Sequence, residues 1–190
     1  SGLVIDFLLA VLSPIYVYGF GKAVWSRRSL RSGELKRNIL LLVAGFFYVL
    51  MTPNATYAFL ELKHLVIKDV MAKPLNFWSV IVFGGLSLIG LTASIVCILA
   101  TVKILRPAEK YRLASITAVS LIQASGATLG ELDVFSWDVF LNPLKVLRGM
   151  ETVIGSPNLL LFIAVLTGFL TLVSLLVIWG TKEDTKKAIK

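Results

Sequence analysis

The chain has 190 residues, of which 57% are hydrophobic and only 16% are charged, and its mean hydropathy is +0.85. A soluble domain of this length carries more charge and fewer apolar residues. Several apolar runs approach the roughly 20 residues that a helix needs to cross a bilayer. Composition and run length therefore argue against a soluble helical bundle and predict an integral membrane protein in contact with the lipid bilayer.

The net charge of +8 does not indicate a nucleic-acid partner. The Lys and Arg residues stand in short connectors between apolar runs, which is where membrane topology signals occur. Cys97 is the single cysteine and lies within an apolar run, so no intramolecular disulfide can form.

Five apolar runs are predicted to be spanning helices. In chain order they cover residues 3–25, 38–52, 77–104, 113–130 and 157–179. We therefore expect an all-α fold, a polytopic transmembrane helix bundle of about five spans, with short interfacial helices on the outer side. Residues 1–180 form one transmembrane domain, and residues 181–190 form a charged cytoplasmic tail.

The connectors differ in basic residues. Thirteen Lys and Arg fall on one side: Arg27, Arg28, Arg31, Lys36, Arg37, Lys103, Arg106, Lys110, Arg112, Lys182, Lys186, Lys187 and Lys190. Five fall on the other: Lys63, Lys68, Lys73, Lys145 and Arg148. The positive-inside rule then places the N-terminus outside and the C-terminus in the cytoplasm.

The segment "MTPNATYAFLELKHLV" interrupts the second run. The helix from Asn38 to Thr52 would be about 22 Å long, which is shorter than a hydrocarbon core of about 30 Å. Pro53 disfavours helical geometry at the preceding residue, and Asn54 can cap a new helix through its side-chain oxygen. We expect a break near the outer leaflet and a new helix over roughly 55–68, with protein or a water-filled cavity satisfying the freed backbone.

Helical spacing places Tyr57, Glu61 and His64 on one polar side of this new helix. One interpretation is an amphipathic helix that anchors at the headgroups. Another is a metal site, because Glu-x-x-His presents two ligands on one helix face. The metal-ligand candidates are Glu61, His64 and Asp138, although one histidine is a sparse supply for zinc or iron. The sequence identifies no cofactor.

The fourth run, "LASITAVSLIQASGATLG", carries hydroxyl and amide side chains among small residues, so it should face protein and not lipid. Gly126 and Gly130 have the Gly-x-x-x-Gly spacing that allows close helix packing. The motif leaves open whether the partner helix belongs to this chain or to another.

A second unusual segment, "ELDVFSWDVFLNP", follows this run. Trp137 suits a membrane-interface belt, Ser136 can cap a short helix, and residues 142–143 can start another through an Asn cap and a first-turn proline. Acidic side chains near an apolar boundary are costly unless they are hydrated, paired or functional. Those of this segment are Glu131, Asp133 and Asp138.

The pair of segments "PNATYAFLELKHL" and "SGATLGELDVFSWDVFLNP" resembles the bacterial membrane family called domain of unknown function thirteen sixty-one. The likeness covers roughly residues 35–175. The matching signature positions are Pro53, Asn54, Tyr57, His64, Gly126, Gly130, Ser136, Trp137 and Asp138. Thr56 replaces a proline of the family, Glu61 replaces an aspartate, and residues 131–135 lack the family's arginines and asparagine. The resemblance supports the fold and the location of a site, and it implies no established activity.

Three functions fit these observations. The first is a non-catalytic accessory or assembly subunit that packs beside other transmembrane subunits or forms a homo-oligomer. The second is a binder or transporter of a small ligand, cation or lipid headgroup at an outer-face polar site next to a discontinuous helix. The third is a membrane-face enzyme in which His64 acts as general base, Glu61 orients it and Asp138 is a second acid. No nucleophile motif or phosphate loop supports the enzyme, and whether the chain is an enzyme stays open.

The site predictions follow from these alternatives. The candidate ligand-binding residues are Tyr57, Glu61, His64, Asp133, Trp137 and Asp138. The residues with an expected structural role are Pro53, Asn54, Gly126, Gly130 and Ser136. The predicted location is the bacterial cytoplasmic membrane or a related energy-transducing membrane.

Overall fold

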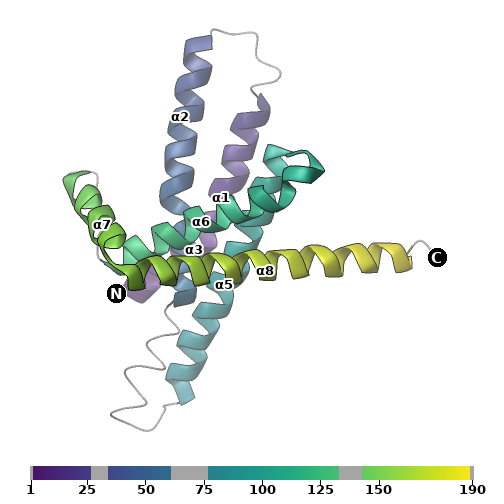
Figure 1. The fold of residues 1–190 in the computed structure, drawn as a ribbon. Coiled ribbons are helices and arrows are strands. Elements are labelled where there is room, and N and C mark those ends of the chain that lie inside the picture. Colours follow the sequence, from purple (N-terminus) through teal and green to yellow (C-terminus); the bar gives the residue numbers. More distant parts are fainter. Residues whose placement is uncertain (1, 27–33, 61–76, 133–142, 189–190) are drawn as a thin grey trace.

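The computed structural model describes residues 2–26, 34–60, 77–132 and 143–188, and within these ranges the chain is helical without a strand. The elements, drawn in Figure 1, are α1 (Gly2–Ser26), α2 (Glu34–Met51), α3 (Pro53–Leu60), α5 (Phe77–Leu105), the short 3-10 helix η1 (Glu109–Tyr111), α6 (Arg112–Glu131), α7 (Pro143–Gly155) and α8 (Pro157–Ala188). The expected all-α helix bundle is confirmed.

The long helices follow the predicted apolar runs closely. Helices α1, α5 and α6 begin and end within one residue of the predicted limits. Helix α2 begins at Glu34, four residues before the predicted start, so the charged turn ahead of the apolar run is helical as well. Helix α8 begins at Pro157 as predicted and continues to Ala188. Pro143 and Pro157 occupy the first helical positions of α7 and α8, where a missing amide hydrogen costs nothing.

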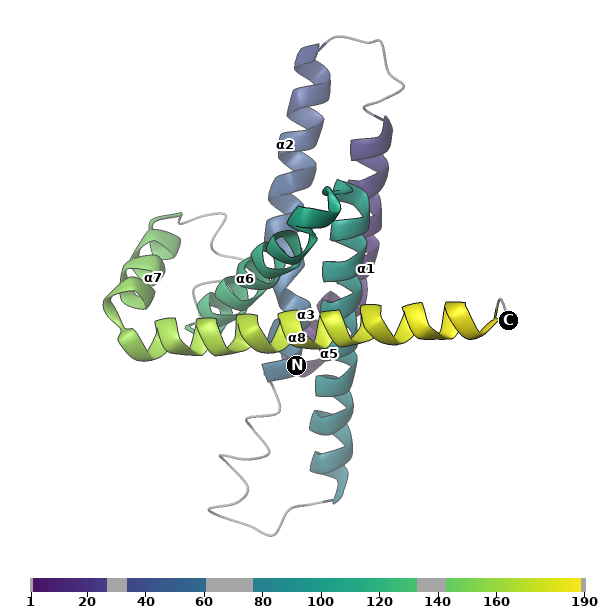
Figure 2. The ribbon, with the colours of Figure 1, turned by 45° about the vertical axis from the view of Figure 1, so that its right-hand side comes forward.

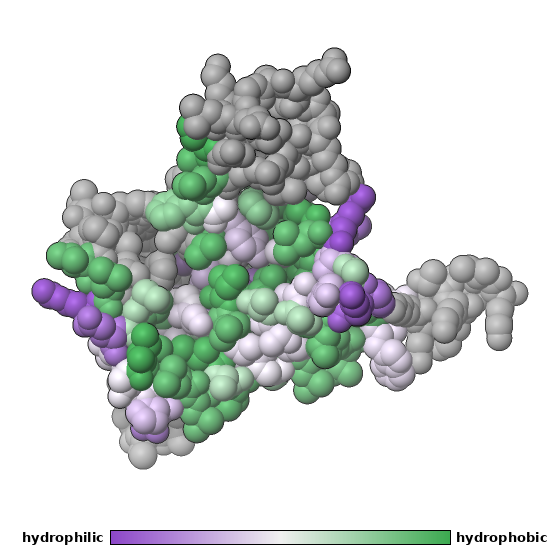
Figure 3. Space-filling view, turned by 45° about the horizontal axis from the view of Figure 1, so that its top comes forward, coloured by the Kyte–Doolittle hydropathy of each residue, from purple (hydrophilic) through white to green (hydrophobic). Residues whose placement is uncertain are grey.

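Three helices of the described part are long and apolar enough to cross a membrane, over Val80–Leu105, Glu109–Glu131 and Pro157–Thr181. Large apolar side chains remain exposed along them, and Figure 3 shows a surface that is mostly apolar with hydrophilic side chains towards its edges. Exposed apolar surface of this extent is suited to lipid. Helix α1 adds a shorter apolar helix over Leu8–Gly21. The count of five spans stays a prediction.

Helix α3 lies at the centre of the bundle and packs against α1, α5 and α6, while α8 packs mainly on α6 (Figures 1 and 2). The largest core cluster joins α5, α6, α7 and α8. Its buried members are Ile98, Val102, Ile116, Val119, Ala124, Val153, Ile163, Leu166 and Leu170. The stacked rings of Phe59 and Phe169, with centroids 5.6 Å apart, connect α3 to α8.

A second cluster fixes α2 to α1 and α5. The Tyr48 hydroxyl lies 2.7 Å from Thr101 Oγ1 of α5, and its ring lies 5.1 Å from that of Phe20 in α1. Cys97 is buried in the same cluster as a free thiol. An interhelical hydrogen bond in an apolar surrounding specifies which helix faces pair.

The candidate spans are not parallel. In Figures 1 and 2 α5 stands upright while α8 lies across it. Two helices that cross in this way cannot both follow the membrane normal. The helix directions alone therefore do not assign each connector to a side of the membrane. The predicted orientation gives that side for each connector and can be tested by labelling.

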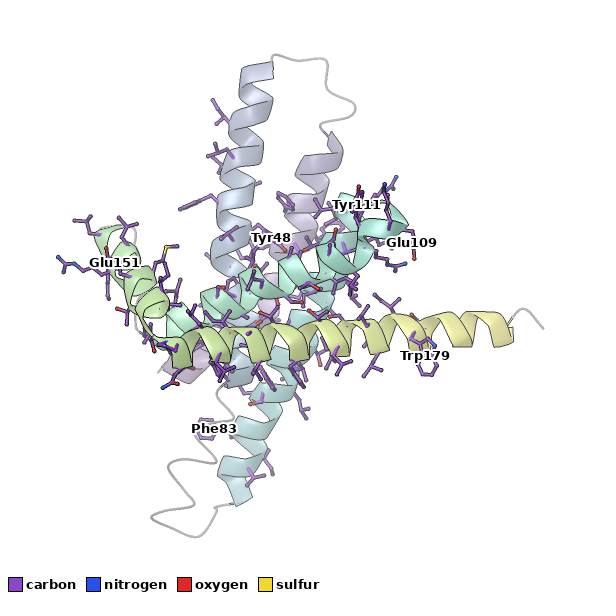
Figure 4. The ribbon with its side chains drawn as sticks, in the orientation of Figure 1. Tyr48, Phe83, Glu109, Tyr111, Glu151 and Trp179 are labelled. Atoms are coloured by element: carbon purple, nitrogen blue, oxygen red, sulfur yellow. The ribbon has the colours of Figure 1, made fainter. Side chains whose placement is uncertain are left out.

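We expect Glu151→Cys to react with a membrane-impermeant maleimide in intact cells, and Glu109→Cys to react only after the cells are lysed. Both side chains are exposed, on α7 and η1 respectively (Figure 4). The predicted orientation places α7 outside and η1 in the cytoplasm. The background is Cys97→Ala, which removes the one native thiol. Equal labelling of both positions in intact cells would contradict the predicted topology.

Candidate functional site

The second apolar run breaks at Pro53, as predicted. The Thr52 amide still donates to the Tyr48 carbonyl at 3.0 Å, which continues the pattern of α2, and α3 then begins at Pro53. Pro53 has no amide hydrogen to offer to the preceding turn. The Thr52 hydroxyl also bonds the Tyr48 carbonyl, at 2.8 Å, an arrangement that bends helices. The new helix starts two residues earlier than expected.

The break leaves the carbonyl group of Met51 without its backbone amide donor, and two side chains donate to it instead. The Ala55 amide bonds Thr52 at 3.3 Å, one residue short of the regular partner. The Met51 carbonyl accepts instead from the Ser13 hydroxyl of α1 at 2.8 Å and from Asn54 Nδ2 at 3.1 Å. Asn54 therefore bonds a freed carbonyl through its amide nitrogen, whereas the sequence predicted a cap through its oxygen. Protein groups satisfy the break, as a membrane interior requires.

Helix α3 is enclosed and does not lie on the surface. Pro53, Ala55, Thr56 and Ala58 are all buried. On the α5 side, a Cβ atom added to Gly90 would lie 2.5 Å from the backbone nitrogen of Phe59 and 2.7 Å from the Ala55 carbonyl oxygen. The two helix backbones are therefore in direct contact. The described part of the expected interfacial helix is a core element.

The Gly-x-x-x-Gly face of α6 packs on the other side of α3. A Cβ atom at Gly126 would lie 2.6 Å from Pro53 Cβ, and one at Gly130 would lie 3.1 Å from Tyr57 Cδ2. The partner helix of this motif is thus within the same chain. Two segments about seventy residues apart in the sequence, each carrying signature positions, meet in one contact.

A buried polar cluster lies between α3, α5 and α6. Thr56 Oγ1 is 2.9 Å from Ser94 Oγ and donates to Gln123 Oε1 at 3.1 Å. All three side chains are fully buried. Gln123 Nε2 and Ser120 Oγ, one turn earlier on α6, have no hydrogen-bond partner among the described residues. An amide end buried without a partner costs about 1–3 kcal/mol. The hydrogen bonds within this cluster therefore leave part of the desolvation cost of its polar groups uncompensated.

The C-terminal ends of α3 and α6 pack against the same apolar cluster. Leu60, the last residue of α3, and Leu132, the residue after α6, both pack against the large apolar cluster. Glu131 is partly buried at the end of α6. The predicted residues beyond these ends lie outside the described residues: Glu61, His64, Asp133, Ser136, Trp137 and Asp138.

The described part of the chain holds no group of three His, Cys, Asp or Glu side chains that could bind a metal. The three metal-ligand candidates named from the sequence are outside that part, so the metal site stays a prediction. Tyr57, Pro53, Asn54, Gly126 and Gly130 are the signature residues that the structure places, and it brings four of them together in the contact between α3 and α6.

Sequence analysis missed Gly90 and Ser94 as partners of α3. Both lie in an apolar run, where glycine and serine are common. Only their small size and their helical spacing could have indicated a helix-packing face. Gln123 was noted among the polar residues of its run, but the identity of its partner, Thr56, depends on the packing of two distant helices.

These features define a polytopic helical membrane protein with a broken helix enclosed at its centre. The model of the family described as protein of unknown function (DUF1361) matches residues 14–173. The chain belongs to this family, which confirms the resemblance found in the two sequence segments. Comparison with curated proteins and comparison with solved structures both find no match.

We expect Gly90→Ala to destabilise the protein by about 1–3 kcal/mol, the usual cost of overpacking. The added methyl group would meet backbone atoms of Phe59 and Ala55, which cannot turn aside as a flexible side chain can. Thermal unfolding in detergent micelles, followed by circular dichroism, measures the effect.

Gly85→Ala is the matched control, because it lies on the same helix and a Cβ atom there would have nothing within 4 Å. Its stability should be unchanged or slightly higher, since alanine is the better helix former. If both variants unfold at the same temperature as the unchanged protein, the result would contradict the close packing of α3 on α5.

Proposed function

We propose that the protein binds a small cation or a cationic lipid headgroup at the membrane boundary, where the chain continues beyond α3 and α6. The observation that supports this proposal is the direct packing of the two signature segments, Pro53 on Gly126 and Tyr57 on Gly130. Leu60 and Leu132, which precede the polar segments, rest on the same core cluster.

The proposal follows from chain connectivity. Glu61 is bonded to Leu60, and Asp133 is bonded to Leu132, so each polar segment starts from an end that is anchored in the bundle. Discontinuous helices that are enclosed by neighbours are a recurring basis of binding sites in membrane proteins. Ionisable side chains close to the apolar region are costly unless they are hydrated, paired or functional, and a cation site would be such a function.

The chemistry of the residues favours a cation. Glu61, Asp133 and Asp138 supply carboxylates, and His64 supplies an imidazole nitrogen. Carboxylates and imidazole together suit a divalent metal ion or an ammonium group.

The test is native mass spectrometry of the protein released gently from its own membrane, combined with elemental analysis for metals. We expect the unchanged protein to retain a metal ion or an amine-containing lipid. His64→Ala and Asp138→Asn should each reduce the retained amount at least tenfold while the helical content stays the same, since a lost ligand removes affinity and not the core.

Glu151→Gln is the matched control, because it removes an exposed carboxylate of α7 that is not among the candidate ligands. Its retained ligand should equal that of the unchanged protein. A protein that retains no ion or amine lipid, or one whose retention is unaffected by His64→Ala and Asp138→Asn, would contradict the proposal.

A second candidate is an accessory or assembly subunit of a membrane complex, and the outer surface of α8 favours it. The last part of this helix extends beyond the rest of the bundle (Figures 1 and 2). Leu172, Leu176 and Trp179 are exposed along α8. Figure 4 shows Trp179 on this projecting part. The same mass spectrum separates the candidates: a stable complex with another chain and no retained ligand would support the subunit and overturn the binder.

A further inference from the structure

The turn between α5 and α6 concentrates positive charge on the surface. Lys103 in the last turn of α5 and Lys110 in η1 are exposed, and Arg106 and Arg112 lie in the same short stretch. Among residues 103–112 the one acidic side chain is Glu109, which pairs with Arg112 at 3.6 Å. The turn thus keeps an excess of cations after that pair is formed.

Apolar and aromatic side chains alternate with these cations. Leu105, Tyr111 and Leu113 are each more than half exposed. Lys110 Nζ lies 4.8 Å from the centre of the Tyr111 ring, so the ammonium group is held over the aromatic face. Figure 4 shows Glu109 and Tyr111 close together in this turn, at the edge of the bundle. Such a surface has an apolar part for acyl chains and a charged part for headgroups.

The turn stands where two candidate spans end. The apolar span of α5 stops at Leu105, and the next candidate span begins at Glu109. Residues between two spans lie at the depth of the lipid phosphates if those spans cross the bilayer. A basic surface at that depth attracts anionic lipids whichever face of the membrane it occupies.

We propose that the turn between α5 and α6, defined as residues 103–113, is a binding surface for the phosphate headgroup of an anionic membrane lipid. Lys103 and Lys110 contact the phosphate, and Leu105, Tyr111 and Leu113 contact the upper acyl chains. This surface is separate from the proposed cation site, and it attracts the opposite charge.

The test uses the full chain in nanodiscs that contain phosphatidylcholine and phosphatidylglycerol in equal amounts. Native mass spectrometry counts the lipids of each kind that stay bound on release. We expect phosphatidylglycerol to be enriched severalfold, and the enrichment to fall as salt rises because the attraction is screened. Lys103→Gln with Lys110→Gln should bring the ratio of the two bound lipids close to one, since these two cations supply the attraction for the anionic headgroup.

Lys145→Gln with Arg148→Gln is the matched control, because it removes two cations from α7 and leaves the turn intact. It should keep the full enrichment, as should the charge-preserving pair Lys103→Arg with Lys110→Arg. Equal retention of the two lipids by the unchanged protein would overturn the proposal. So would a control that loses as much enrichment as the test variant, because the effect would then arise from net charge alone.

Discussion

The structure depends on the direct contact of α3 with α5 and α6, where three glycines on the neighbouring helices let α3 approach closely. Gly90 meets the backbone of α3, Gly126 meets Pro53, and Gly130 meets Tyr57. Such close approach maximises dispersion contacts, which matter most where lipid tails offer no hydrophobic driving force. It also brings Thr56 within hydrogen-bond distance of side chains on both neighbours. A bulkier residue at any of these positions would move α3 away from the whole cluster.

The broken helix explains why α1 belongs to the core. A carbonyl group that loses its helical donor must find another in an apolar interior, because water is not there to replace it. The Met51 carbonyl finds the Ser13 hydroxyl, and Ser13 also bonds Leu9 of its own helix at 2.8 Å. The same serine precedes Pro14, the proline inside α1. This hydrogen bond thus joins α1, next to its proline, to the end of α2, two residues before Pro53.

Local patterns were enough to predict most helices and the position of the break. Apolar runs set the limits of α1, α5 and α6 and the start of α8, and Pro53 set the end of α2. The glycine spacing predicted close packing without identifying the partner, since a helix face is compatible with any smooth neighbour. The cluster of Thr56, Ser94 and Gln123 was beyond prediction because it joins three helices whose arrangement depends on tertiary packing. Glu61, His64 and Asp138 lie outside the described residues, so their roles stay predictions.

Because α3 occupies the glycine face of α6, that face is not open to another subunit. A partner chain would have to use surfaces that this chain leaves exposed, such as the side of α8 that carries Leu172, Leu176 and Trp179. The small-residue motif therefore does not support assembly with another chain. It supports a rigid interior within this one. A rigid interior is what a binding site at the ends of α3 and α6 needs, since ligands held by anchored elements lose less freedom on binding. For this reason the packing supports the binder more directly than the subunit.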